Sequence, residues 1–86
     1  MADWTAVEAE LEALLAADGF ELVRMDKVTG RGARLTIFAD RAGAPGTITL
    51  DDCAEISRRV SAWLDLSDPF TGPYRLMVSS PGLTGR

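Results

Sequence analysis

The sequence predicts a two-layer α/β sandwich, an α+β fold in which two helices cover one face of a three-stranded sheet. Two segments carry apolar residues at the offsets 0, 3, 7, 10 and 11, which is the spacing of a helix with one buried stripe. Three other segments have the apolar and β-branched composition of strands. The segments follow one another in the order α-β-β-α-β, and the matching stripes indicate that both helices lie on the same side of the sheet.

The first helix is expected over Thr5–Ala17. Thr5 followed by Glu8 has the spacing of a capping box, in which each residue bonds the other's backbone N–H. Glu10 and Glu12 join Glu8 on the outer side, so this helix is strongly acidic. Its apolar stripe consists of Trp4, Val7, Leu11, Leu14 and Leu15.

The next two segments, Phe20–Val28 and Arg34–Asp40, are expected to form an antiparallel hairpin. The turn between them contains Gly30 and Gly32, and tight turns favour glycine. In the second strand, apolar side chains at alternate positions predict one buried face. In the first strand, alternation puts apolar residues on both faces, with Phe20 and Leu22 on one side and Val23 and Met25 on the other.

The segment from Thr49 to Leu64 predicts the second helix, and the other elements are expected to pack around its stripe. Thr49 can cap the first turn through its hydroxyl, and Asp52 at the third helical position can complete a capping box. Ile48 lies where a hydrophobic staple would close against Cys53. The apolar stripe consists of Cys53, Ile56, Val60, Trp63 and Leu64.

A loop with two prolines precedes the last strand, which is expected over Tyr74–Ser80. The second and third strands are joined through a helix, so they should run parallel with a right-handed crossover. Placing the third strand beside the first, antiparallel to it, gives the predicted sheet order 2-1-3.

One face of this sheet has no helix to cover it. Phe38 and Met77 are expected on that face together with Thr36. An apolar patch of this kind, fringed by Arg24 and Arg75, predicts a docking surface. The alternative is that the two side chains are isolated apolar residues on the surface, which are common. The residues expected to face the helices are Leu35, Ile37, Leu76 and Val78.

The composition excludes several classes of site. A chain of 86 residues suits one domain, and 47% apolar with 26% charged residues is a globular balance. No apolar run is long enough to span a membrane. The sequence has no histidine, so Ser-His and Cys-His nucleophile pairs and His-based zinc sites are excluded. The adjacent carboxylates Asp51 and Asp52 are expected to cap a helix rather than to catalyse, so we predict no enzyme activity.

The net charge of −4 favours a basic protein partner over a nucleic-acid backbone. The single cysteine forms no internal disulfide, which favours a reducing, cytoplasmic setting. One alternative is a small RNA-binding module whose basic hairpin grips phosphates, although a solvated hairpin that balances the acidic helices explains the same residues. Another alternative is an orphan dimerisation domain that uses the open sheet face. The basic residues around the hairpin are Lys27, Arg31, Arg34 and Arg41.

Five segments carry a resemblance to a known family. They are residues 19–23, 35–40, 49–57, 64–65 and 74–83, and their most distinctive parts are Asp51-Asp52-Cys53-Ala54 and Ser79-Ser80-Pro81-Gly82. In this order they resemble the amino-terminal domain of the ribosome maturation factor RimP family. The resemblance covers nearly the whole chain, and the fold that it implies agrees with the α-β-β-α-β order.

This resemblance implies a factor that assists assembly of the small (30S) ribosomal subunit. Such a factor binds the immature particle and helps a basic ribosomal protein of the decoding region take its place, without enzyme activity or a cofactor. Among the matching positions, Asp51, Asp52 and Asp65 are the expected contacts with a basic partner, and helix capping is their alternative role. Cys53 is expected to pack in the core. Ser57 is a further matching position. The last four matching positions are expected to shape the exit from the last strand, and they are Ser79, Ser80, Pro81 and Gly82.

We expect residues 1–82 to form the RimP-like α/β domain. In the family, the Ser-Ser-Pro-Gly run leads into a second, β-rich domain. Residues 83–86 are therefore expected to be a C-terminal tail or the start of a linker to such a domain. We do not expect this chain to have full maturation activity by itself.

Overall fold

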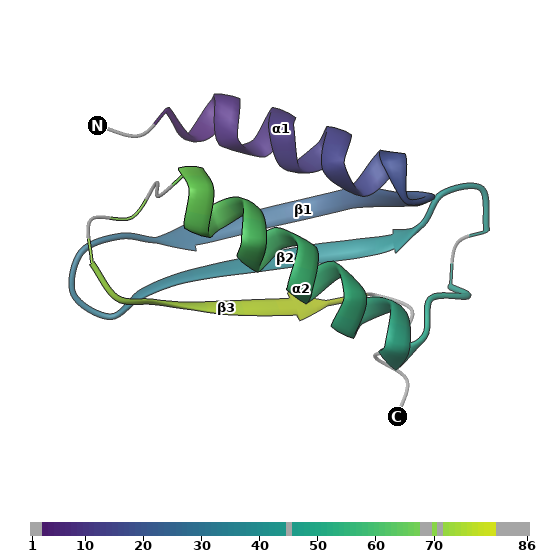
Figure 1. Ribbon diagram of the computed structural model, residues 1–86. Helices are drawn as coiled ribbons and strands as arrows, with labels where there is room; N and C mark the ends of the chain where they lie inside the picture. The colour runs from purple at the N-terminus through teal and green to yellow at the C-terminus, as the bar shows by residue number, and fades with distance from the viewer. Residues whose placement is uncertain (1–2, 45, 68–69, 71, 81–86) are drawn as a thin grey trace.

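The chain folds in the predicted order, with two helices lying over one three-stranded sheet (Figure 1). The computed structural model describes residues 3–44, 46–67, 70 and 72–80. The helices are α1 (Trp4–Ala17) and α2 (Leu50–Ser67), and the strands are β1 (Phe20–Val28), β2 (Ala33–Arg41) and β3 (Tyr74–Ser79). The α+β two-layer prediction is confirmed, and the observed bounds stay within a few residues of those predicted.

The sheet has the order β1-β2-β3, so the predicted order 2-1-3 is wrong. β2 pairs antiparallel with β1 and parallel with β3, which confirms the predicted hairpin and the parallel crossover. The central place of β2 follows from burial, because Leu35, Ile37 and Ala39 are completely buried. β1 carries the exposed charges Asp26 and Lys27, which suit an edge strand because an edge pairs on one side only.

A β-bulge in β1 changes which side chains of that strand reach the core. Leu22 pairs with Ala39 and Arg24 pairs with Phe38, so Val23 is an extra residue opposite the β2 ladder. The extra residue shifts the alternation by one position. Met25 therefore packs against the core on the same face as Phe20 and Leu22, and the predicted division of β1 into two apolar faces is wrong.

Both helices pack on the same face of the sheet and form the core with it (Figure 1). α1 contacts β1, α2 contacts β3, and the helices contact each other. The predicted stripes are confirmed, with Trp4, Leu14 and Trp63 only partly buried. Neither helix has an apolar stretch long enough to cross a bilayer. The fully or nearly buried stripe residues are Val7, Leu11, Leu15, Cys53, Ile56, Val60 and Leu64.

The two helices begin in different ways. At α2 the predicted capping box is present: Asp52 accepts a hydrogen bond from the Thr49 backbone N–H at 3.0 Å, and the Thr49 hydroxyl accepts from the Asp52 N–H at 3.1 Å. At α1 the predicted box of Thr5 and Glu8 is wrong. The helix starts one residue earlier, and the Asp3 carboxylate accepts from the Thr5 and Ala6 N–H groups at 3.1 and 3.3 Å. Aspartate is among the best capping residues, so it displaces Thr5 from that role.

The loop between β2 and α2 is held by a buried carboxylate. Asp40, which is 8% exposed, accepts from the backbone N–H of Arg41 at 2.9 Å and from that of Gly46 at 3.1 Å. Gly46 has φ +82°, a conformation that glycine adopts without strain. These polar contacts fix the loop ahead of α2, and Ile48 then anchors it in the core as a buried apolar residue.

Leu64 and Leu66 provide a matched test of the α2 stripe, because they are the same residue type two positions apart. Leu64 is 1% exposed and Leu66 is 88% exposed. Leu64→Ala is expected to lower the free energy of unfolding by about 2–5 kcal/mol, since it leaves a cavity in the core. Leu66→Ala should change it by less than about 0.5 kcal/mol. Urea denaturation measures both values, and equal losses would contradict the assignment of the buried face.

Candidate functional site

The first turn of α2 contains two carboxylates with different surroundings. Asp52 is engaged in the capping box, and its Oδ2 also lies 3.3 Å from Nη2 of Arg41. The backbone hydrogen bond from Thr49 lowers the pKa of Asp52; the Thr49 hydroxyl and the charge of Arg41 lower it further, and desolvation opposes them. Asp51 is exposed and has no hydrogen bond or ion pair within the described part of the chain. Asp52 therefore holds the helix start, and Asp51 is the carboxylate open to a partner.

The residues predicted to meet a basic partner do not form one site. Asp65 lies near the other end of α2, fourteen residues from Asp51, which corresponds to about 20 Å along a helix. Phe38 and Met77 lie on the sheet face that the helices leave open. The predicted set is thus spread over the two ends of α2 and the far side of the sheet.

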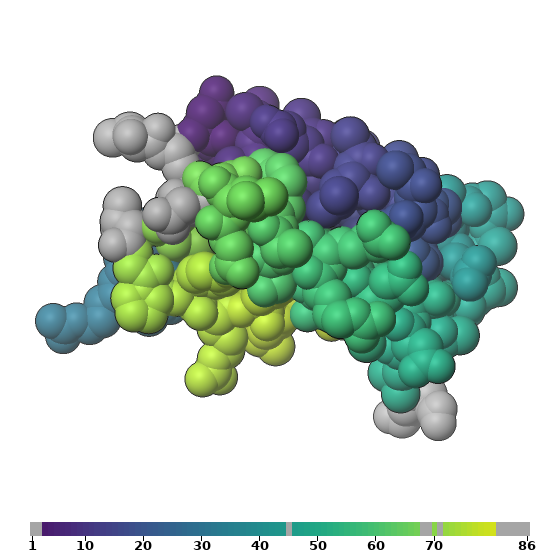
Figure 2. All heavy atoms as spheres, in the orientation of Figure 1, coloured from purple at the N-terminus to yellow at the C-terminus, as the bar shows by residue number. Residues whose placement is uncertain are grey.

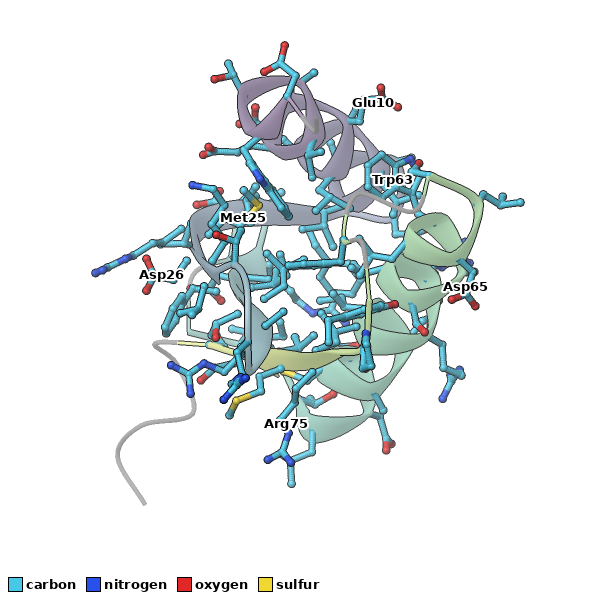
Figure 3. The ribbon with its side chains drawn as sticks, turned by 90° about the vertical axis from the view of Figure 1, so that its left-hand side faces the viewer. Glu10, Met25, Asp26, Trp63, Asp65 and Arg75 are labelled. Carbon is cyan, nitrogen blue, oxygen red and sulfur yellow. The ribbon has the colours of Figure 1, made fainter. Side chains whose placement is uncertain are left out.

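The helices carry a larger group of unpaired carboxylates than the sequence prediction singled out. Among the described residues, five exposed helical carboxylates have no hydrogen bond or ion pair. Figure 3 shows Glu10 and Asp65 on the outer sides of their helices, pointing away from the sheet. We call this group the acidic helix face, a term that covers both helices and both flanks of α1, since Glu8 and Glu12 lie on one flank of its buried stripe and Glu10 on the other. It consists of Glu8, Glu10 and Glu12 of α1 and Asp51 and Asp65 of α2.

The signal for the three α1 residues was present in the sequence. Residues 4–17 contain Glu8, Glu10 and Glu12 and no basic residue at all, so no i, i+4 ion pair can neutralise them. In α2, by contrast, Arg59 lies 3.4 Å from a Glu55 oxygen and 2.6 Å from an oxygen of Asp18, the residue that ends α1. The negative charge that stays uncompensated is therefore concentrated on α1 and at the two ends of α2.

On the open sheet face, Phe38 and Met77 occupy neighbouring strands. Met77 is 47% exposed and is the Cα partner of Thr36. Phe38 is half-buried, and the Arg24 guanidinium carbon lies 5.8 Å from the centre of its ring. Both side chains are directed as the alternation predicted. Phe38 is the Cα partner of Ser79, so Phe38 and Met77 are diagonal neighbours on the open face, and their role in docking stays a prediction.

The predicted basic cluster is only partly assembled. Lys27, Arg31 and Arg34 lie at the turn end of the β1–β2 hairpin. Arg41 lies at the opposite end of β2, roughly 23 Å from Arg34 at the usual rise of a strand, and is paired with Asp52. Arg75 of β3 takes its place, because it is the Cα partner of Arg34. Arg41 does not belong to this cluster, because it comes at the end of the second strand and therefore lies away from the turn.

The remaining motif residues that the structure describes are buried or half-buried. Cys53 is 8% exposed; burial raises the pKa of its thiol, and the charge of Asp52 adds to this effect. Ser57 and Ser79 are half-buried and Ser80 is buried, whereas Pro81 and Gly82 lie outside the described residues. Within the described part of the chain, no three acidic or cysteine side chains gather where they could hold a metal ion.

The capping role of Asp52 has a testable pH dependence. Its native pKa is lowered, so the ionised carboxylate stabilises the fold near neutral pH, and this contribution is lost as the pH falls through the native pKa, which lies below the ordinary value of an aspartate. Asp52→Asn should therefore lower the urea midpoint at neutral pH, and the gap to the unmodified chain should close in acid. Asp51→Asn is the control and should have a smaller effect. Equal effects of the two substitutions would contradict the capping assignment.

Comparison with known protein families agrees with this geometry. A family model described as the RimP N-terminal domain matches residues 10–84. The match includes most of α1, the whole of the sheet, all of α2 with its capping box, and the residues that follow β3. It covers far more than half of the 86 residues. The chain therefore belongs to the RimP family of ribosome maturation factors, as its amino-terminal domain.

Proposed function

We propose that this domain assists assembly of the small (30S) ribosomal subunit by docking a basic ribosomal protein on its acidic helix face. Family membership supports a partner related to the ribosome. The finer identification, a basic protein of the decoding region presented to the immature particle, rests on the resemblance and on the charge of this face. Such a role belongs to the cytoplasm, where ribosomes are assembled, and needs no cofactor or catalytic group.

The proposal rests on where the unpaired carboxylates lie. Of six acidic side chains without a hydrogen bond or ion pair among the described residues, five belong to the acidic helix face, and the sixth is Glu21 of β1. Carboxylates without intramolecular partners keep their charge available to a cationic surface. They also attract such a surface from a distance, which raises the association rate and makes it sensitive to salt.

The arrangement on α1 adds an energetic reason. Glu8 and Glu12 are four residues apart, so they are neighbours on one side of the helix, and like charges at this spacing destabilise a helix by about 0.2–0.5 kcal/mol. Lysine or arginine side chains of a partner would remove that repulsion when they bind. The interaction is expected to stay accessible to solvent, so each contact is worth at most about 1 kcal/mol and the whole face is needed for specificity.

Neutralising the acidic helix face is the direct test. Glu8→Gln with Glu12→Gln should weaken binding of a purified basic small-subunit protein by roughly three- to tenfold at low salt, since two exposed charge contacts are lost. The difference from the unmodified chain should shrink as salt is added, because exposed charges are screened. Fluorescence anisotropy or calorimetry measures the dissociation constants.

The matched control is Glu21→Gln with Asp26→Asn, which removes the same charge from β1. This control should leave binding nearly unchanged apart from a small long-range effect. If it weakens binding as much as the α1 variant does, the attraction depends on net charge alone, and the acidic helix face is not the docking surface.

A further inference from the structure

An open hollow of about 1010 Å³ lies at the end of the sheet where the hairpin turns. Its walls come from the start of α1, the tip of the β1–β2 hairpin and the beginning of β3, so distant parts of the sequence meet there. Figure 2 shows the hairpin tip projecting beyond the rest of the surface, next to the residues that lead into β3. We call this feature the hairpin-end hollow.

Most of the described basic side chains that form no ion pair line the hollow. Among the described residues, Arg24, Arg41 and Arg59 are in ion pairs. Five other described basic side chains have no ion pair, and four of them line the hollow, while no acidic residue appears among its described walls. These four are Lys27, Arg31, Arg34 and Arg75.

The placement of two of these arginines is unfavourable for the isolated domain. Arg34 and Arg75 are Cα partners on adjacent strands, and like charges directly opposite each other destabilise a sheet. Figure 3 shows Arg75 extending away from the ribbon, below β3. An anionic ligand between the two guanidinium groups would turn this repulsion into two favourable contacts.

Aromatic surface adjoins the charge. The rings of Trp4 and Phe70 have their centres 5.0 Å apart, and those of Phe70 and Tyr74 are stacked at 4.9 Å. Phe70 is buried, whereas Trp4 and Tyr74 are half-exposed and line the hollow. Lys27 Nζ lies 5.6 Å from the centre of the Trp4 ring. Exposed aromatic rings next to cations are the combination on which unpaired nucleic-acid bases stack.

The cations also lie on both sides of the sheet. Lys27 is the Cα partner of the buried Leu35 and shares the helix-side face, whereas Arg34 and Arg75 belong to the open face. A single small anion cannot reach both sides. A flexible polyanion that passes around the end of the sheet can do so. The backbone of such a polyanion can approach the hairpin tip closely, because Gly30 and Gly32 have no side chain and a Cβ built on either would meet no atom within 4 Å.

We propose that the hairpin-end hollow binds a single-stranded segment of RNA, with phosphates on Lys27, Arg31, Arg34 and Arg75 and a base against Trp4. This inference goes beyond the proposed function and uses none of the residues of the acidic helix face. An acidic peptide would satisfy the cations but not the aromatic walls, so it is one of the outcomes that the experiment separates.

The test is fluorescence anisotropy with a labelled single-stranded RNA of about ten nucleotides, a length within the usual site size for such proteins. Arg31→Gln, Arg34→Gln and Arg75→Gln should each weaken binding roughly three- to tenfold and should each reduce the slope of log K against log salt by about 0.7. Arg58→Gln is the matched control, because Arg58 is the other unpaired arginine of the described chain and lies on α2. Arg58→Gln should leave both quantities unchanged.

A second readout follows Trp4 itself. The chain has two tryptophans, so Trp63→Phe leaves Trp4 as the only indole fluorophore. Single-stranded RNA should quench this fluorescence, and polyglutamate, inorganic phosphate and duplex RNA should not quench it at the same concentration of charge. Loss of quenching in the Arg34→Gln background would tie the base contact to the phosphate contact.

Three results would overturn the inference: no binding of single-stranded RNA at about 50 mM salt, an equal loss in Arg58→Gln, or equal competition by polyglutamate. The outcome is independent of the proposed function, because Glu8→Gln with Glu12→Gln should not weaken RNA binding, and the arginine variants should not weaken binding of the basic protein. A negative result for the acidic helix face therefore does not affect the test of the hairpin-end hollow, and the reverse also holds.

Discussion

The whole structure depends on burial of one face of β2. Leu35, Ile37 and Ala39 are completely buried there, and both helices bring their stripes to that face. A chain of 86 residues has only enough apolar surface for one such core. The outer sides of the helices, the far face of the sheet and the hairpin tip therefore contribute little to folding. Charged side chains can occupy these surfaces because they stay in contact with water there.

Separation of charge follows from this layout. The helices carry most of the unpaired carboxylates, and the hairpin end carries most of the unpaired cations. Two of the ion pairs, Arg59 with Asp18 and Arg41 with Asp52, join different segments of the chain, and the other two lie within β1 and within α2. The domain thus carries unpaired charges of opposite sign on separate surfaces.

Most local features of this fold could be predicted from the sequence, as could the parallel direction of β3 relative to β2 and the placement of both helices on one face, but the order of the strands could not. The helix stripes, the hairpin and the Thr49–Asp52 capping box depend on residues within a few positions of one another, and all were confirmed. The sheet order depends on which edge β3 joins, which no local pattern encodes. That error hid the pairing of Arg34 with Arg75. The α1 cap was missed because Asp3 and Thr5 are both good capping residues and lie only two positions apart, so the sequence does not say which of them begins the helix.

The bulge at Val23 has a consequence for the opposite end of the molecule. Side chains on a strand alternate with a period of two, so one additional residue reverses the phase of everything after it. Upstream of Val23 the even-numbered positions point toward the helices, and downstream the odd-numbered ones do. Without this reversal, Lys27 would point away from α1 and its ammonium group would not lie over the indole of Trp4. A single inserted residue near one end of β1 thus determines which cation faces which aromatic ring about four residues further along the strand.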